Sequence, residues 1–164
     1  MKVKCFMVLL LLYSCSGPSK DELLTQYLIT HFNRPEDRFP KAIVVVAEDG
    51  CIHCDRAFAD LVRLRTSNPD ILFVVRIEGS AVDMHGFMEE SERMHFDDDR
   101  SFKQLGILAG SGLILMEESH IDTIIPIQLE GIEEQLSCIE SALDAIRPYK
   151  NAAPSHENAA FNVP

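Results

Sequence analysis

The sequence predicts an α/β domain in which a mixed central β-sheet is flanked by helices on both faces. Residues 43–47 and 71–75 are continuous apolar runs rich in β-branched side chains, and residues 54–62 between them have helical periodicity. Two strands that are apolar on both faces and joined by a helix are typical of parallel neighbours in a covered sheet. Two further apolar runs, 113–116 and 121–125, are separated by four polar residues and predict an antiparallel hairpin.

A helix precedes the first central strand. Ser19 and Glu22 have the spacing of a capping box, and the apolar face that follows ends before Pro35. That face contains Leu24, Tyr27, Leu28 and His31. No linker separates this helix from the strand, so we expect it to belong to the same domain.

Two cysteines lie where the first central strand ends and its helix begins. Gly50 breaks the apolar run immediately before Cys51, and Cys54, Phe58 and Val62 then recur at helical spacing. The first turn of a helix carries unpaired N–H groups and a partial positive charge, which stabilise a thiolate at Cys51. Cys54 falls on the apolar face, three residues into the helix. This arrangement predicts an attacking thiol and a shielded resolving thiol.

The acidic residues near the pair oppose the effect of the helix. Glu48, Asp49 and Asp55 disfavour a thiolate, but exposed charges contribute only a few tenths to about 1 kcal/mol each. We therefore expect a modest net lowering of the Cys51 pKa.

The remaining elements are shorter, except for the last helix. An amphipathic helix interrupted by Gly86 is expected in the stretch 80–96, with a short extended piece at its end. Asp98 or Asp99 can cap a short helix that Gly106 terminates. The last helix has apolar residues spaced four, three, four and three apart: Ile132, Leu136, Ile139, Leu143 and Ile146. Pro148 ends it, and residues 148–164 predict a disordered tail.

The N-terminus has the pattern of an export signal. Residues 1–14 contain Lys2 and Lys4 and then an apolar run that is too short to span a bilayer. The residues that follow resemble the bacterial lipobox, which implies that Cys15 is lipidated. The expected organisation is a signal peptide over 1–14, a lipidated N-terminus and tether over 15–20, and one domain over 21–147. The expected location is the bacterial cell envelope, lipid-anchored and facing the periplasm or the outside.

Charge and cysteine usage narrow the possible partners. The formal net charge is −11, and removal of the two lysines with the signal makes it −13. Such an acidic protein is not expected to bind nucleic acid, or an anionic membrane surface by charge. Export places the remaining cysteines, Cys51, Cys54 and Cys138, where disulfides can form and exchange. We expect Cys138 to be a half-buried small residue on the flank of the last helix.

Residues 41–147 resemble the thioredoxin superfamily. The resemblance rests on the strand ending at Cys51-Ile52-His53-Cys54, the following helix and parallel strand, the hairpin and the last helix. The insertion at 80–96, followed by residues 97–107, is similar to the TlpA-like branch of envelope-anchored thiol-disulfide oxidoreductases. The resemblance implies a thioredoxin-like fold, Cys51 as nucleophile and Cys54 as resolving cysteine. It implies no cofactor, and as partners exported protein thiols or disulfides and a membrane redox protein. His53 lies in the position of the histidine in the Cys-Pro-His-Cys motif of DsbA-like proteins, where an imidazole can donate a hydrogen bond to the thiolate and favour the reduced form.

The chain departs from the family pattern at three positions. Ser111 falls where the family has the cis-proline of its substrate loop, and because a cis bond before a non-proline costs about 2.5 to 4 kcal/mol we expect a trans bond there. Val45 replaces the buried aspartate of thioredoxin, with Glu48 as the nearest carboxylate. Gly50 replaces the tryptophan before the first cysteine.

Two other functions remain open for the cysteine pair. The cysteines can form a structural disulfide in a thioredoxin-fold binding module without catalytic activity, or they can bind zinc or copper(I). The other candidate metal sites are weaker. A Met-rich helix packed on the sheet is preferred over a copper-binding stripe, and a solvated helix cap at residues 97–99 is preferred over a calcium site. The residues of that stripe would be Met84, His85, Met88, Met94 and His95.

Overall fold

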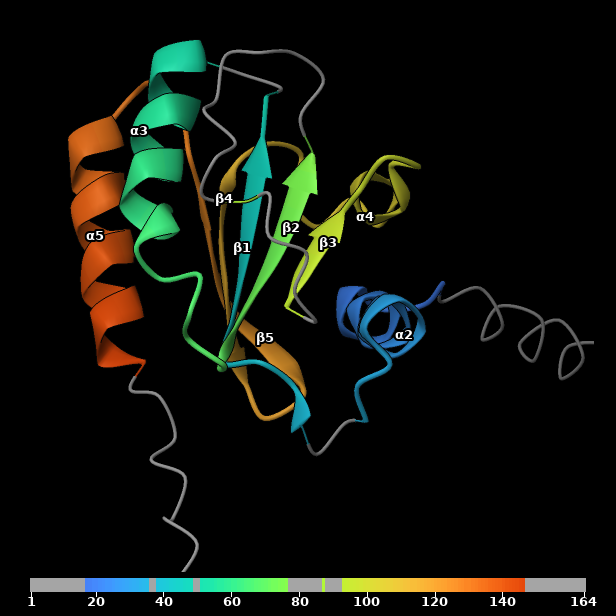
Figure 1. The fold of residues 1–164 in the computed structure, drawn as a ribbon. Coiled ribbons are helices and arrows are strands. Elements are labelled where there is room, and N and C mark those ends of the chain that lie inside the picture. Colours follow the sequence, from blue (N-terminus) through green and yellow to red (C-terminus); the bar gives the residue numbers. More distant parts are fainter. Residues whose placement is uncertain (1–16, 36–37, 49–50, 77–86, 88–92, 147–164) are drawn as a thin grey trace, which may run out of the picture.

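The protein has a mixed α/β fold (Figure 1). The computed structural model describes residues 17–35, 38–48, 51–76, 87 and 93–146. The elements in chain order are α2 (Lys20–Phe32), β1 (Ala42–Ala47), α3 (Ile52–Arg63), β2 (Ile71–Arg76), β3 (Met94–Phe96), α4 (Ser101–Gln104), β4 (Gly112–Glu117), β5 (His120–Pro126) and α5 (Ile132–Ala145). Within these ranges there are four helices and a five-stranded sheet.

The sheet is mixed, with β1 at its centre. Its strand order is β3-β2-β1-β4-β5, in which β1, β2 and β3 are parallel and β4 and β5 are antiparallel to their neighbours. All six residues of β1 are fully buried. The predicted α/β class and mixed sheet are therefore confirmed. The carboxyl ends of β1, β2 and β3 lie at the same end of the sheet, and α3 begins there.

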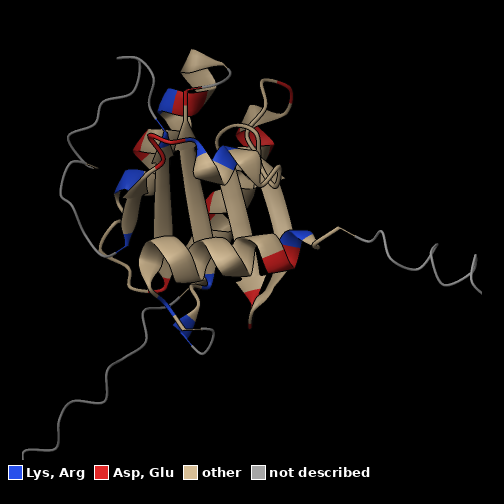
Figure 2. Cartoon of the chain, turned by 90° about the vertical axis from the view of Figure 1, so that its right-hand side faces the viewer, with Lys and Arg blue, Asp and Glu red and all other residues tan. Residues whose placement is uncertain are grey.

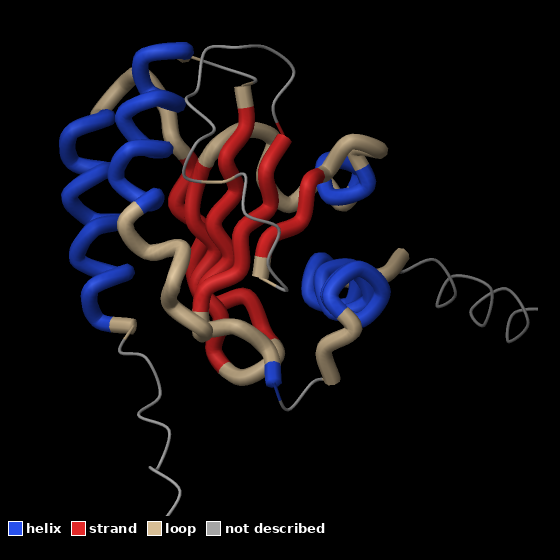
Figure 3. The backbone as a smooth tube through the Cα atoms, viewed as in Figure 1, coloured by secondary structure: helices blue, strands red, loops and turns tan. Residues whose placement is uncertain are grey.

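Helices cover both faces of the sheet, so that helices, sheet and helices form three layers (Figure 3). One face carries α3 and α5, and the core there combines Phe58 and Val62 with Ile139 and Phe73. The other face carries α2 and α4, and its core combines Leu24, Tyr27 and Phe102 with alternate residues of the same strands. Figure 2 shows α2 crossing the strands, whereas α3 and α5 run alongside them in Figure 1. In Figure 2 the strands contain few charged residues, and α2 has its acidic residues at its first turn.

Local residues determine where α2 begins and where the β4–β5 hairpin turns. Ser19 and Glu22 form the predicted capping box, in which each side chain accepts the backbone N–H of the other residue. The hairpin is tighter than the sequence predicts, because Glu117 pairs with His120 and only two residues form the turn. Glu118 has a φ of 56° there. The first and last residues of the four expected loop residues therefore extend the strands.

The cap of α4 uses the predicted Asp99 and, in addition, Asp97. Asp99 accepts the Ser101 N–H at 2.9 Å, and Asp97 accepts hydrogen bonds at Oδ1 from the Ser101 hydroxyl (3.1 Å) and the Phe102 N–H (2.9 Å). The left-handed conformation of Arg100, φ 59°, turns the chain back so that this earlier aspartate reaches the helix. Gly106, φ 64°, follows the helix as predicted. Most of the expected helix within 80–96 lies outside the described residues, whereas the short extended piece is β3.

A buried ion pair joins the ends of β2 and β3. Arg76 is 3% exposed and its Nη1 lies 3.9 Å from Oδ2 of Asp97, which is 1% exposed. Arg76 also donates from Nη2 to the Ala109 carbonyl oxygen at 2.7 Å. Truncating one member of such a pair leaves the other charge buried, so both residues are needed for this edge to fold.

Gly112 begins β4 at a point where the sheet has no room for a side chain. A Cβ at this position would lie 2.5 Å from the Ile125 carbonyl oxygen and 3.1 Å from the Cα of Pro126. We expect Gly112→Ala to lower the free energy of unfolding by about 1 to 3 kcal/mol, because backbone of the neighbouring strand must move. Urea unfolding measures this. Gly110→Ala is the control, since nothing lies within 4 Å of its added Cβ. Equal stability of the two variants would contradict the close approach.

Candidate functional site

Cys51 is the N-cap residue of α3, the position that the sequence predicts for the attacking thiol. Its Sγ accepts the backbone N–H of Cys54 at 3.4 Å, and its carbonyl oxygen accepts the N–H of Asp55 at 2.9 Å. The thiol therefore takes the place of the serine or aspartate oxygen that usually caps a helix. Cys51 is partly exposed and Cys54 is buried, and both are free thiols in this structure.

The two thiols differ in acidity. Hydrogen bonds from the Cys54 thiol and from the backbone N–H groups of Cys54 and His53 lower the pKa of Cys51 below its ordinary value. The Cys51 sulfur, burial and nearby negative charge raise the pKa of Cys54 to about 11. The direction for Cys51 agrees with the expectation from the helix terminus. Of the two thiols, Cys51 is therefore the more acidic and the one that reaches solvent.

Asp55 is a buried acid beside the pair, and the sequence analysis treated it only as an opposing surface charge. It is 4% exposed, and its charge raises the pKa of both Cys51 and Cys54. Its spacing to Phe58, Ala59 and Val62 is three, four and seven residues, which is the spacing of the buried face of α3. That pattern was the available signal for its burial.

The two residues between the cysteines are exposed. Ile52 is 54% exposed, and the His53 side chain is also on the surface. His53 acts on Cys51 through its backbone N–H. The predicted role of its imidazole in stabilising the thiolate stays a prediction.

Ser111 closes the end of the sheet next to this site. The β1–β4 pairing ends at Val45 and Gly112, and beyond it the Ser111 hydroxyl donates to the Ala47 carbonyl oxygen (2.8 Å) and accepts the Ala47 N–H (3.0 Å). The Ser111 carbonyl oxygen accepts the Ile127 N–H at 2.9 Å. Among the described residues no peptide bond is cis, as expected. The Ser111 side chain thus replaces the pair of backbone hydrogen bonds that β4 would otherwise make with Ala47. Ala47 lies four residues before Cys51.

Of the other two departures from the family pattern, the structure describes Val45 and the nearby Glu48. Val45 is fully buried on the α2 and α4 face, and Glu48 is partly buried, with its N–H donating to the Arg76 carbonyl oxygen at 3.2 Å. Gly50 lies outside the described residues. Asp55, rather than Glu48, is the buried carboxylate whose charge reaches the cysteines.

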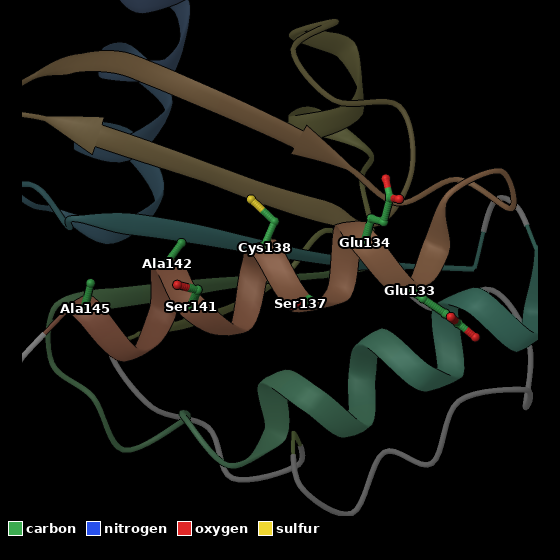
Figure 4. A pocket seen from close by; sticks show the side chains of 7 residues that line it. All are labelled: Glu133, Glu134, Ser137, Cys138, Ser141, Ala142 and Ala145. Carbon is green, nitrogen blue, oxygen red and sulfur yellow. The ribbon is translucent and has the colours of Figure 1, made fainter.

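Cys138 is not half-buried as expected but exposed. It lies in an open hollow along α5, and its side chain projects away from α3 (Figure 4). The hollow is lined by residues of this one helix: Glu133, Glu134, Ser137, Cys138, Ser141, Ala142 and Ala145. The helix buries Ile139 and Leu143 and leaves this flank uncovered. Nothing here joins Cys138 to the Cys51–Cys54 pair.

The predicted N-terminal features lie outside the described residues, including Cys15. Among the helices that the structure describes, none has the length and hydropathy needed to cross a membrane. In the same part of the chain, the one group of three candidate metal ligands among His, Cys, Asp and Glu is His95, Asp97 and Asp99, which excludes both cysteines.

Fold and site together define a mixed α/β protein with a pair of free cysteines at the start of the helix that follows its central strand. Comparison of the chain with protein-family models, with curated proteins and with solved structures finds no match. The chemistry of the site therefore has to be argued from its own residues.

Replacing Asp55 tests the electrostatics of the pair. Because its negative charge opposes both thiolates, we expect Asp55→Asn to lower the pKa of Cys51 and of Cys54 further. The measurement is the rate of alkylation against pH, with Cys5, Cys15 and Cys138 replaced by serine. Asp60→Asn is the control, because Asp60 lies exposed on the same helix beside Arg63. An unchanged or higher Cys51 pKa in Asp55→Asn would contradict the assignment.

Replacing Ser111 tests the closure of the sheet. Ser111→Ala removes both hydrogen bonds to Ala47 and leaves a buried N–H and carbonyl without them. We expect a loss of about 1 to 3 kcal/mol in the free energy of unfolding, measured by urea titration. Ser137→Ala, on the exposed flank of α5, is the matched control and should change stability by less than about 0.5 kcal/mol. If the two variants are equally stable, the hydroxyl does not hold the strand end.

Proposed function

We propose that this chain is an exported, lipid-anchored thiol-disulfide oxidoreductase of the thioredoxin superfamily, most similar to its TlpA-like branch. The observation that carries the proposal is the asymmetry of the cysteine pair. Cys51 caps α3, is accessible and has a lowered pKa, whereas Cys54 is buried and has a raised pKa. Nucleophilic attack needs the first combination and protected resolution needs the second.

The arrangement of the elements supports a thioredoxin-like fold. β1, α3 and β2 form a parallel unit, β4, β5 and α5 follow as an antiparallel hairpin and helix, and helices lie on both faces of the sheet. The cysteines follow the carboxyl end of the central strand. In open α/β sheets, functional residues commonly lie just beyond the carboxyl ends of parallel strands. Export and lipidation rest on the N-terminal sequence, with Lys2, Lys4 and Cys15 as their residues.

The exchange proceeds in two displacement steps. The Cys51 thiolate attacks one sulfur of a partner disulfide, a Cys51–partner S–S bond forms, and the second partner sulfur leaves as a thiolate. Cys54 then loses its proton and attacks the Cys51 sulfur. The Cys51–Cys54 disulfide forms, and the first partner sulfur leaves as a thiolate that takes up a proton. The partner gains two electrons and the protein loses two; the reverse sequence oxidises a partner dithiol, and neither direction needs a cofactor.

The surface around Cys51 suits a protein partner. Ile52 offers an exposed apolar side chain directly beside the thiol, and His53 offers an exposed polar one. We expect exported proteins with accessible thiols or disulfides as substrates and a membrane redox protein as the source or sink of electrons. The acidic charge of the chain favours partners that present basic surfaces near the exchanging sulfur.

The test is the reduction potential of the pair in the full chain with Cys5, Cys15 and Cys138 replaced by serine, equilibrated against glutathione buffers and read by thiol trapping. We expect a value between about −120 and −230 mV, the range of thiol-disulfide oxidants, isomerases and glutaredoxins. A disulfide that remains closed below about −300 mV would favour the structural staple of a binding module instead.

The single-cysteine variants are the matched control for the same experiment. Cys54→Ser keeps the attacking thiol and should accumulate a mixed disulfide with glutathione, whereas Cys51→Ser should not. Equal trapping by the two variants would remove the distinction between attacking and resolving thiols on which the proposal depends.

A further inference from the structure

A second group of chemically reactive side chains lies at the edge of the sheet formed by β3. His95 belongs to β3, Asp97 follows the strand directly, and Asp99 lies in the turn before α4. Each offers one potential ligand atom, and these three atoms all lie within 4.8 Å of one another. A metal ion bonded at about 2.0 to 2.2 Å to each atom would need only a small contraction of this group.

Helix α2 completes the surroundings of the group from the other side. The rings of His31 and His95 have centroids 4.7 Å apart, and the ring of Tyr27 lies 5.8 Å from that of His95. Residue pairing places His95 opposite Val74, on the face of the sheet that α2 covers. Two histidines, two aspartates and a tyrosine therefore meet where β3, the turn and α2 converge.

Two buried polar atoms in this group have no hydrogen-bond partner among the described residues. They are the hydroxyl oxygen of Tyr27, whose residue is only 4% exposed, and Nε2 of His95. The Tyr27 hydroxyl lies near the group, since burial and the charges of Asp97 and Asp99 raise the pKa of Tyr27 and the Ser101 side chain lowers it. Buried polar atoms without partners are rare in folded proteins and call for an explanation such as an ion.

The carboxylate of Asp97 is held in the manner of a metal ligand. It accepts hydrogen bonds from the Ser101 hydroxyl, the Phe102 N–H and the Lys103 N–H (3.4 Å). An ionised carboxylate has about four acceptor positions, so one remains. Arg76, 3.9 Å away, balances part of the negative charge. Ligating carboxylates are commonly oriented by such outer hydrogen bonds.

We propose that His95, Asp97 and Asp99 form a zinc site, with His31 of α2 and the Tyr27 hydroxyl next to the ion. Imidazole nitrogen combined with carboxylate oxygen is a ligand set that suits zinc and other divalent transition metals, whereas calcium and magnesium prefer oxygen alone. Bound zinc would tie α2 to the end of β3 and thereby stabilise the α2 and α4 face of the domain. The site uses no residue of the cysteine pair, so it is independent of the proposed redox function.

The experiment is a calorimetric titration of zinc into the full chain with all five cysteines replaced by serine, so that no thiolate competes. The unsubstituted chain with its thiols blocked by iodoacetamide serves if the serine variant does not fold. We expect one zinc ion per chain, and at least about tenfold weaker binding in His95→Gln and in Asp99→Asn. Asp99→Asn keeps an oxygen to accept the Ser101 N–H, so the turn should stay folded. Asp97 is not replaced, because it caps α4 and pairs with Arg76.

Two substitutions that alter the same residue types elsewhere are the controls. Asp98→Asn removes a carboxylate charge from an exposed side chain that is next to Asp99 in the sequence. His120→Gln removes an exposed imidazole. Both should bind zinc within about twofold of the parent chain. Absence of saturable binding, equal weakening by Asp98→Asn and Asp99→Asn, or stronger binding of calcium than of zinc would each overturn the site.

Discussion

The complete burial of β1 is the constraint on which the rest of the structure depends. Its six residues are inaccessible to solvent and pair with β2 on one side and β4 on the other. Because side chains of one strand alternate between faces, the strand divides the core into one half under α3 and α5 and another under α2 and α4. The chain must leave β1 at the carboxyl end of this strand, which is one end of the sheet. The start of α3, and with it the position of Cys51, follows from that exit.

The proposed chemistry depends on a contrast that this exit creates within one helical turn. Cys51 lies where backbone N–H groups are still unpaired, and Cys54 lies where the helix turns its side into the core. Asp55 works against both thiolates, so the acidity of Cys51 results from several donated hydrogen bonds that outweigh a buried negative charge. The charge of Asp55 therefore keeps Cys51 less acidic than the helix terminus alone would make it.

The sequence predicted the elements whose boundaries depend on neighbouring residues. The apolar runs of β1 and β2, the capping box of α2 and the stop at Gly106 are local patterns and are confirmed. The cap of α4 was predicted only in part, because Asp97 joins Asp99 in it through the left-handed backbone of Arg100, which no local pattern required. The exposure of Cys138 was also missed, since helical spacing shows which side of α5 is apolar but not how far its neighbours extend over the flank. The expected arrangement of attacking and shielded thiols followed from position along the helix alone.

The group around His95 shows why a three-dimensional site can be invisible in a sequence. Tyr27 and His31 come from a helix that precedes β1, and only the crossing of α2 over the edge of the sheet brings them to β3. Read locally, the three successive aspartates indicate a helix cap, and Asp97 does serve as one. Capping uses some of the acceptor positions of this carboxylate and leaves another free, so the local interpretation and a metal site are compatible. The buried hydroxyl of Tyr27 and the buried Nε2 of His95 have no hydrogen-bond partners in the described part of the chain, and this distinguishes the group from an ordinary solvated cap.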